Sequence, residues 1–161
     1  MPIKILFLSL IILFSACASS VKTNQISKNA PTTRITLLNG EYISLNKFYD
    51  KNLVLVFWAK WCARSRKNLK ILNEIAGDVR FKNKYKFIAV SLDAEKHIYD
   101  LQEYIMANQL NNLTHSASGN QGSDEAFIAF NGGNLPHIFL IKNGKIIKDT
   151  HNAKELKEFL N

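Results

Sequence analysis

Two hydrophobic periodicities alternate along the chain after residue 31. The run Leu53 to Ala59 is continuously apolar and β-rich, which is typical of a strand covered on both faces, and Lys86 to Leu92 forms a second such run. From Cys62 onward the period becomes helical. Apolar residues on one predicted face are Leu69, Leu72, Ile75, Ala76 and Val79. A second helix is marked by Ile98, Leu101 and Ile105, and a terminal one by Leu156, Phe159 and Leu160.

Two Asn-Gly dipeptides predict tight hairpins in the same pattern. Asn39-Gly40 separates 34–38 from 41–45, and Asn143-Gly144 separates 137–141 from 145–150. Residues 111–124 are polar and glycine-bearing, so a loop is expected there, followed by a short helix over 124–130. The order hairpin, β-α-β-α, hairpin, α predicts an α/β fold. We expect a central mixed sheet flanked by helices, with an N-terminal β-hairpin.

The first seventeen residues have the pattern of a targeting segment. One lysine, Lys4, precedes an apolar run over 5–14 that only Ser9 interrupts. This run of about ten residues is too short to span a bilayer but suits a signal-peptide core. It ends in Phe14-Ser15-Ala16-Cys17, which resembles the lipobox of bacterial lipoproteins, although that family usually has Leu where Phe14 stands. The resemblance implies lipidation of Cys17.

An alternative processing route stays open at the same place. Ala16-Cys17-Ala18 also fits ordinary signal peptidase, which would release a soluble secreted protein cut after Ala18. We favour the lipoprotein, anchored in a membrane and facing the periplasm or the cell exterior. The predicted organisation is then a signal peptide over 1–17, a Ser-, Asn- and Lys-rich flexible tether over 18–30, and one domain over 31–161.

Composition narrows the classes of partner. The formal charge is +8, but no basic run is longer than two residues and no nucleic-acid module is visible, so nucleic acid is not an expected partner. The four histidines (His97, His115, His137 and His151) match no metal-site spacing. We therefore expect neither a metal nor a cofactor.

Cys62 is the candidate reactive group. Because Cys17 is either lipidated or removed, Cys62 would be the only free thiol of the mature protein. It stands at a predicted strand-to-helix junction, where unsatisfied N–H groups and the helix dipole favour a thiolate. Lys60, Arg64 and Arg66 would act in the same direction if their side chains approach the sulfur.

The segment from Val54 to Ser65, Val-Leu-Val-Phe-Trp-Ala-Lys-Trp-Cys-Ala-Arg-Ser, resembles the active-site strand and helix start of thioredoxins. The nearest branch is the membrane-anchored, extracytoplasmic redoxins of the TlpA type. Leu135-Pro136 and the strand after it resemble the cis-proline strand of the same family. The resemblance implies a thioredoxin fold and thiol-disulfide oxidoreductase activity. It implies Cys62 as the catalytic residue, an active-site loop of Trp61, Ala63, Arg64 and Ser65, and substrate docking at Leu135 and a cis Pro136.

The chain departs from that family pattern at three positions. Ser65 replaces the resolving cysteine, which rules out a dithiol cycle within the chain. Val56 stands where thioredoxins place a buried acid, and Arg64 stands where proline is common. A single thiolate can still form mixed disulfides, which a second thiol must release. That second thiol is either the substrate's own or a small-molecule one, so the expected partners are protein thiols or disulfides, with a small-molecule thiol as the alternative source of release. The alternative function is a redox-inactive, membrane-tethered binding module.

Two further residues have open roles. Asp93 follows the second buried strand, at the sheet edge where sites of such folds lie, but a helix N-cap would explain it equally well. His137 follows Pro136 and either approaches Cys62 or packs elsewhere in the protein.

Overall fold

The computed structural model describes residues 24–161. The predicted signal peptide over 1–17, Cys17 itself and the first part of the predicted tether lie outside the described residues. Among residues 24–161, no helix combines the length and the apolar character that crossing a bilayer requires.

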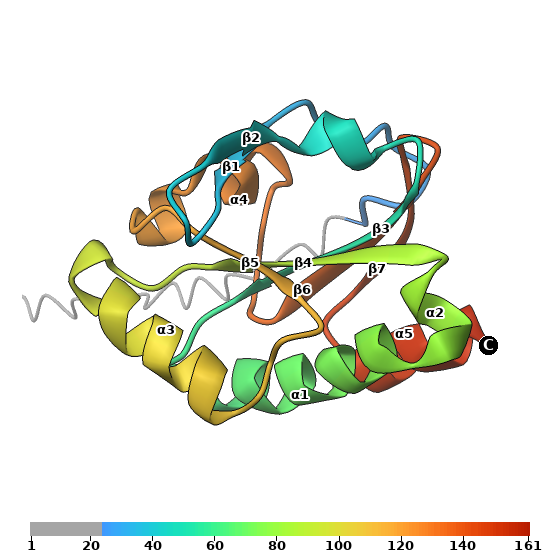
Figure 1. The fold of residues 1–161 in the computed structure, drawn as a ribbon. Coiled ribbons are helices and arrows are strands. Elements are labelled where there is room, and N and C mark those ends of the chain that lie inside the picture. Colours follow the sequence, from blue (N-terminus) through green and yellow to red (C-terminus); the bar gives the residue numbers. More distant parts are fainter. Residues whose placement is uncertain (1–23) are drawn as a thin grey trace, which may run out of the picture.

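The centre of the molecule is a five-stranded sheet in the order β5-β4-β3-β6-β7 (Figure 1). The strands are β3 (Asn52–Trp58), β4 (Tyr85–Ser91), β5 (Thr114–Ala117), β6 (His137–Lys142) and β7 (Lys145–Thr150). Strands β3, β4 and β5 run parallel to one another, while β6 runs antiparallel to β3 and β7 runs antiparallel to β6. The predicted mixed sheet, with its antiparallel pair at one end, is confirmed.

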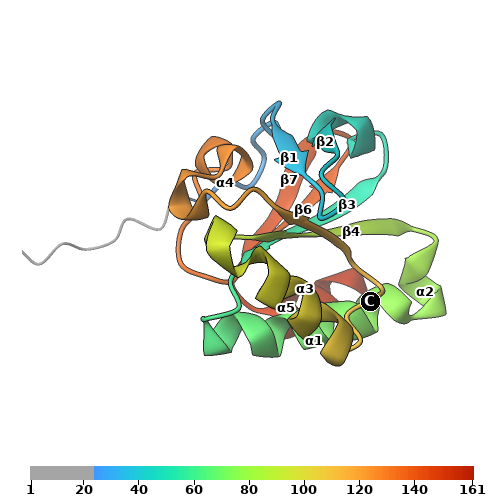
Figure 2. The same cartoon turned by 60° about the vertical axis from the view of Figure 1, so that its left-hand side comes forward.

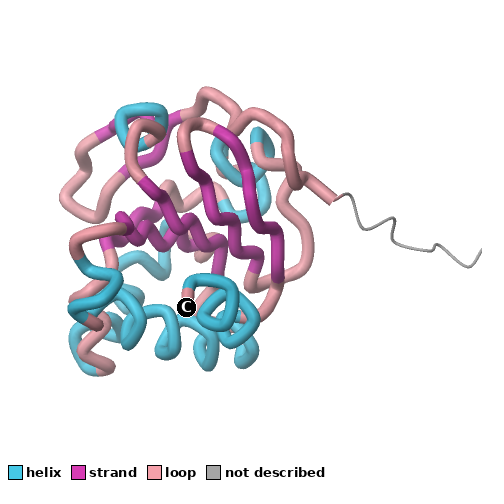
Figure 3. The backbone as a smooth tube through the Cα atoms, turned by 90° about the vertical axis from the view of Figure 1, so that its right-hand side faces the viewer, coloured by secondary structure: helices cyan, strands magenta, loops and turns pink. Residues whose placement is uncertain are grey.

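Helices cover one face of this sheet, and the N-terminal hairpin with a short helix covers the other (Figures 1 and 2). The lower layer in Figure 1 holds α1 (Ala63–Gly77), α2 (Val79–Lys82), α3 (Ile98–Ala107) and α5 (Ala153–Leu160). The upper layer holds β1 (Arg34–Thr36), β2 (Tyr42–Ser44) and α4 (Glu125–Ala129). Short 3-10 turns occupy Leu45–Phe48, Glu95–His97 and Gln121–Ser123. Figure 3 shows the same layers from a perpendicular direction.

The two layers give two hydrophobic cores, which explains the uninterrupted apolar run of β3. Val54, Val56 and Trp58 belong to the core beneath the sheet, packed on α1, α3 and α5. Leu53, Leu55 and Phe57 alternate with them and belong to the core under the hairpin and α4. Because both faces are buried, every position of the strand must be apolar. Cys62 therefore follows the most enclosed strand of the fold.

Two secondary-structure elements differ from the sequence prediction. Residues 114–117, predicted as loop, form the edge strand β5, which pairs with β4. Val79, predicted to lie on the apolar face of the first long helix, is 83% exposed. Helix α1 ends at Gly77, and Asp78 is extended and caps the separate turn α2 by accepting from the Arg80 N–H, so the helical face does not continue to Val79.

Residues 24–30 lie along β7, where a flexible tether was expected. The Ser27 N–H donates to the Ile146 carbonyl, the Ile146 N–H donates to the Lys28 carbonyl, and the Ala30 N–H donates to Gly144. Gln25 is buried. The described fold therefore includes residues before the expected boundary at Pro31. The reason is backbone pairing, which a polar sequence supports as well as an apolar one.

Candidate active site

Cys62 is the N-cap residue of α1, four residues after the end of β3. Ala63 begins the helix, so the predicted strand-to-helix junction is confirmed. The thiol is partly exposed, and Cys62 is the single cysteine among residues 24–161. Within the described part of the chain, the sulfur therefore has no partner for an internal disulfide.

The Leu135–Pro136 peptide bond is cis, as the resemblance implied. Pro136 is buried at the start of β6, and the carbonyl of Leu135 turns toward the active-site loop. The Cys62 thiol donates to this carbonyl oxygen at 3.8 Å. The two segments that carry the sequence resemblance, which are 73 residues apart, therefore meet at the sulfur.

Arg64 makes the closest polar contacts to the same carbonyl. Its Nε and Nη2 atoms donate to Leu135 O at 2.9 and 2.6 Å. The other two cations considered for the sulfur are engaged elsewhere. Lys60 Nζ lies 3.6 Å from Asp100, and Arg66 Nη1 donates to the Lys60 carbonyl at 2.6 Å. Of the three, Arg64 is the one whose charge favours the Cys62 thiolate.

The pKa of Cys62 lies below its ordinary value. Partial burial of the thiol is the largest single effect and raises the pKa, but several groups that lower the pKa together outweigh it. These are the Ser65 hydroxyl, the N–H groups of Ser65 and Arg64, and the Arg64 charge. The thiol makes no capping bond and donates instead to Leu135 O. The N–H groups at the start of the helix therefore stabilise chiefly the thiolate, which has no proton to donate and can only accept hydrogen bonds.

Ser65 lies one turn into α1 and is fully buried. Among the residues that the structure describes, its Oγ has no hydrogen-bond partner of ordinary geometry. The hydroxyl lies close enough to Cys62 to lower the pKa of the thiol. A buried hydroxyl without a strong acceptor is costly. A thiolate at Cys62 would supply that acceptor, so the two side chains stabilise each other in the deprotonated state.

Asp93 holds the loop that precedes Cys62. Its Oδ2 accepts from the Lys60 N–H at 2.8 Å and from Ser91 Oγ at 2.6 Å, and the carboxylate is almost fully buried. The N-cap alternative is not what the structure shows, since the residue that caps the following turn is Ala94. Asp93 therefore acts through the backbone of the active-site loop.

An apolar cleft of about 480 Å³ opens beside the sulfur. Trp61 and Leu135 flank Cys62 in this cleft, and Leu92 and Phe127 form its apolar lining. The Trp61 ring is 69% exposed, so it presents a large apolar surface at the rim. Of the predicted site residues, this cleft brings together Trp61, Cys62, Arg64 and Leu135, while Cys17 lies outside the described residues.

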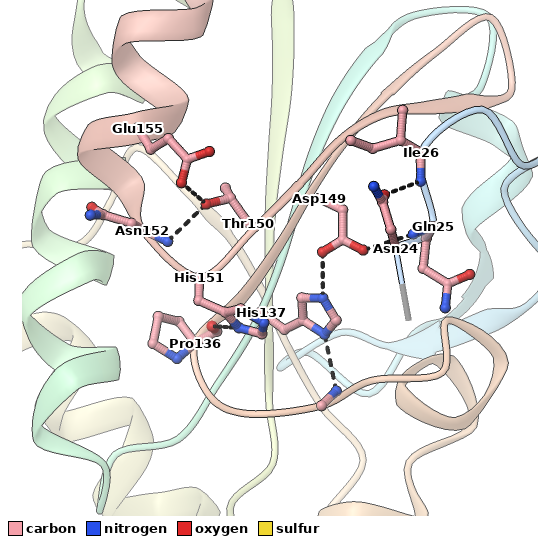
Figure 4. A network of polar contacts seen from close by, with 11 residues as sticks. Asn24, Gln25, Ile26, Pro136, His137, Asp149, Thr150, His151, Asn152 and Glu155 are labelled. Atoms are coloured by element: carbon pink, nitrogen blue, oxygen red, sulfur yellow. Dashed lines mark hydrogen bonds and ion pairs between the residues drawn. The ribbon is translucent and has the colours of Figure 1, made fainter. Parts of the chain in front are cut away.

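His137 is buried in a polar network with Asp149 (Figure 4). The Gly133 N–H donates to His137 Nδ1 at 3.0 Å, so Nδ1 carries no proton and the ring must donate through Nε2 to Asp149 Oδ1 at 2.8 Å. Asp149 Oδ2 also accepts from the Gln25 N–H at 3.0 Å. The His151 ring stacks on His137 at 4.4 Å and donates through Nδ1 to Pro136 O at 2.8 Å.

Burial lowers the pKa of His137, against the opposing effect of Asp149. The packed alternative for this histidine therefore holds, and the imidazole is neutral with a fixed tautomer. Across residues 24–161, no group of three or more histidine, cysteine or carboxylate side chains is arranged to hold a metal ion.

Sequence reasoning did not anticipate three of these contacts. The Arg64–Leu135 and His137–Asp149 contacts join residues 71 and 12 positions apart, and neither spacing belongs to a local motif. The role of Asp93 depends on its carboxylate reaching back to the Lys60 N–H across two strand ends. Only its place at the end of a parallel strand gave a signal.

Comparison with known proteins gives a consistent result. Residues 26–150 match the sequence model of the AhpC/TSA family. Thiol-disulfide oxidoreductase ResA of Bacillus cereus (strain ATCC 10987 / NRS 248) is 28% identical over 152 residues, covering 92% of this chain and 84% of that protein. ResA of Bacillus anthracis is 30% identical over 125 residues, covering 77% and 68%.

Solved structures agree on the fold. The thioredoxin domain of a thiol-disulfide oxidoreductase from Bacteroides vulgatus aligns with a TM-score of 0.70 at 21% identity, covering 86% of this chain and all of that chain. A putative thiol:disulfide interchange protein DsbE from Chlorobium tepidum aligns with a TM-score of 0.69 at 22% identity, covering 84% and 94%. The predicted thioredoxin fold is confirmed, and the chain belongs to the AhpC/TSA family, with ResA-type thiol-disulfide oxidoreductases among its relatives.

Proposed function

We propose that this protein is an extracytoplasmic thiol–disulfide exchange protein that acts through Cys62 alone. The observation that carries the proposal is the position of the sulfur, at the N-terminus of α1 and against the carbonyl that precedes a cis proline, with its pKa lowered. Its relatives are named thiol-disulfide oxidoreductases. Protein thiols or disulfides are accordingly the proposed substrates.

The proposed reaction is a mixed-disulfide exchange. The Cys62 thiolate attacks one sulfur of a substrate disulfide, forming a Cys62–substrate bond and releasing the other sulfur as a thiolate. Trp61 and Leu92 would hold the apolar part of the substrate in the cleft, while Leu135 would pair with its backbone. Because Ser65 cannot form a disulfide, the bond is then broken by a thiol from outside the chain.

We further propose that the protein acts outside the cytoplasm, held at a membrane by lipid on Cys17. The support is the apolar run over 5–14 and the Ser15-Ala16-Cys17 sequence that ends it. One solved relative, at 19% identity, is described as a secreted disulfide oxidoreductase of Mycobacterium tuberculosis. Mass measurement of the protein from its host membrane would test this: a diacylglycerol adduct on Cys17 supports the anchor, and an N-terminus at residue 19 supports secretion.

The test of the exchange activity is the rate at which Cys62 is alkylated as a function of pH, in the full chain carrying Cys17→Ser. A lowered thiol pKa predicts that the rate rises at a pH well below that of free cysteine. The same protein should form a mixed disulfide with a peptide disulfide, and Cys62→Ala should form none. An ordinary thiol profile with no mixed disulfide would leave the binding-module alternative, in which Cys62→Ser keeps full function.

A further inference from the structure

A second, polar cleft of about 950 Å³ adjoins the apolar one. Arg64, Gly133 and Asn134 line both clefts, so their openings share one rim. The polar cleft is also lined from α1, from α5 and from the end of β7 with the residues after it, including Lys67, Asn68, His151 and Lys154. Figure 4 shows part of its wall, where His137, Asp149 and His151 lie between β6, β7 and the start of α5.

The polar cleft carries unbalanced positive charge. Arg64, Lys67 and Lys154 line it, and no carboxylate in the described part of the chain pairs with any of them. The two acids of the lining are already engaged. Asp149 accepts from His137 and from the Gln25 N–H, and Glu155 pairs with Lys148 and accepts from Thr150. An occupant with carboxylate groups would therefore meet available cations.

The size of the cleft suits a small molecule. A volume near 950 Å³ falls within the range of small-molecule sites, which is roughly 300–1,000 Å³. Asn134, which lines both clefts, adds an amide side chain to the wall. An amide can bind a peptide-like or carboxylate ligand by hydrogen bonds. A protein substrate already has the neighbouring apolar cleft beside Leu135.

We propose that this cleft binds a low-molecular-weight thiol that carries carboxylate groups, and that this thiol releases the mixed disulfides formed on Cys62. The inference rests on the proposed function, because it names the second thiol which that function needs. Arg64 links the two events: its guanidinium, now on Leu135 O, reaches both clefts and would move to the carboxylate of the small thiol.

The exchange balances in two steps. The thiolate of the first small thiol attacks Cys62 Sγ, forming a Cys62–small-thiol disulfide, breaking the bond to the substrate and releasing the substrate as a thiol. A second small thiolate attacks the sulfur of the bound small thiol, which frees Cys62. Two small thiols are oxidised to their disulfide, and their two protons end on the substrate thiol and on Cys62.

Binding can be tested without any reaction at the sulfur. S-methylglutathione carries two carboxylates and no free thiol, and it would be titrated by calorimetry into the full chain carrying Cys17→Ser and Cys62→Ala. We expect saturable binding that weakens roughly fivefold or more when Lys67→Gln and Lys154→Gln are combined, and that weakens with added salt. Lys70→Gln is the matched control, because this exposed α1 lysine lies outside the cleft and should not change the affinity.

A kinetic arm tests the release step. The starting material is a preformed Cys62 mixed disulfide, and the measured quantity is the rate of substrate release by 3-mercaptopropionate divided by the rate of release by 2-mercaptoethanol. This ratio should be higher for the chain with Lys67 and Lys154 intact than for the Lys67→Gln, Lys154→Gln protein. Absence of saturable S-methylglutathione binding would overturn the inference whether or not Cys62 exchanges disulfides. Binding of an acidic peptide in place of S-methylglutathione would also overturn it. An unreactive Cys62 with intact binding would instead remove the proposed function.

Discussion

The Cys62 thiol and the Arg64 guanidinium share one acceptor, the carbonyl oxygen of Leu135. Arg64 holds this oxygen through two N–H groups at 2.9 and 2.6 Å, while the thiol reaches it at 3.8 Å. A substrate backbone that uses the same oxygen must therefore displace the Arg64 side chain. Arg64 is thus placed both to favour the thiolate and to occupy the carbonyl at which we propose that a substrate docks.

Replacing Arg64 by glutamine and, separately, by lysine should distinguish the effect of its charge from that of its contact with Leu135. The Cys62 pKa should rise because a neighbouring positive charge is lost, and alkylation near neutral pH should slow by roughly two- to fivefold. Iodoacetamide rates measured across a pH series check this. Arg64→Lys keeps the charge but loses the forked contact, so its pH profile should stay closer to that of the original chain. An unchanged profile in Arg64→Gln would show that the charge does not reach the sulfur.

Ser65→Cys should convert the single-thiol site into a dithiol. The Ser65 side chain is buried against the sulfur of Cys62, one helical turn away, where a second sulfur could be oxidised to a disulfide with it. In the Cys17→Ser chain, mild oxidation should remove both thiols, and reduction of a protein disulfide should become catalytic with dithiothreitol as electron source. Thiol titration and an insulin-reduction assay would measure this. Ser65→Ala should gain neither property, and two thiols that survive oxidation would contradict the placement of Ser65.

Asp93→Ala should destabilise the fold and disturb the loop before Cys62. It leaves the Lys60 N–H and the Ser91 hydroxyl without their acceptor in a buried site, which costs about 1–3 kcal/mol of unfolding free energy. Urea denaturation measures the loss. Asp93→Asn keeps one acceptor oxygen and should lose less. Asp100→Ala, at a half-exposed position, should change stability little; equal losses in Asp93→Ala and Asp100→Ala would count against the positioning role.

Stability should fall with pH below about 6.5 because of His137. Burial lowers its pKa in the folded state, so the unfolded chain takes up the proton first as the pH drops. The contribution is complete above the ordinary pKa of 6.5 and is lost as the pH falls through the folded value. The buried His115, whose pKa is also lowered by burial, acts in the same direction.

Urea midpoints measured near pH 7.5 and near pH 5 should therefore differ less in His137→Gln than in the original chain. His97→Gln is the control, since that side chain is half-exposed near Asp100. The reading would be wrong if the difference between the two midpoints is the same in His137→Gln and in the original chain.

Much of this fold follows from local sequence. The two-sided burial of β3, the Asn143-Gly144 hairpin and the helix after Cys62 each have a periodic or turn signal that burial enforces. Strand β5 has none: Thr-His-Ser-Ala is short and mostly polar, and it is a strand because β4 offers an edge to pair with. The backbone pairing of residues 24–30 to β7 depends in the same way on a tertiary surface.

The features of the site also fall into those that follow from neighbouring residues and those that depend on tertiary packing. The junction at Cys62 was predictable from the change of periodicity in neighbouring residues, and the cis peptide at Pro136 from the resemblance to thioredoxins. The Arg64 contact with Leu135 and the Asp149 contact with His137 were not, since they depend on rotamers chosen after distant segments have packed. The sequence predicts positive charge near the sulfur, but it does not say which of Lys60, Arg64 and Arg66 supplies it. In the structure Arg66 binds the Lys60 carbonyl and Lys60 pairs with Asp100, which leaves Arg64.

The backbone pairing of residues 27–30 with β7 and the turn before it bears on the proposed lipid anchor, because it fixes this part of the chain to the domain. If Cys17 carries the lipid, the seven backbone steps from Cys17 to Asn24 span at most about 25 Å, whatever their conformation. That is shorter than the diameter of a small domain. Substrates would then be met at the bilayer surface, by a domain whose attachment point is fixed beside Asp149 and His137.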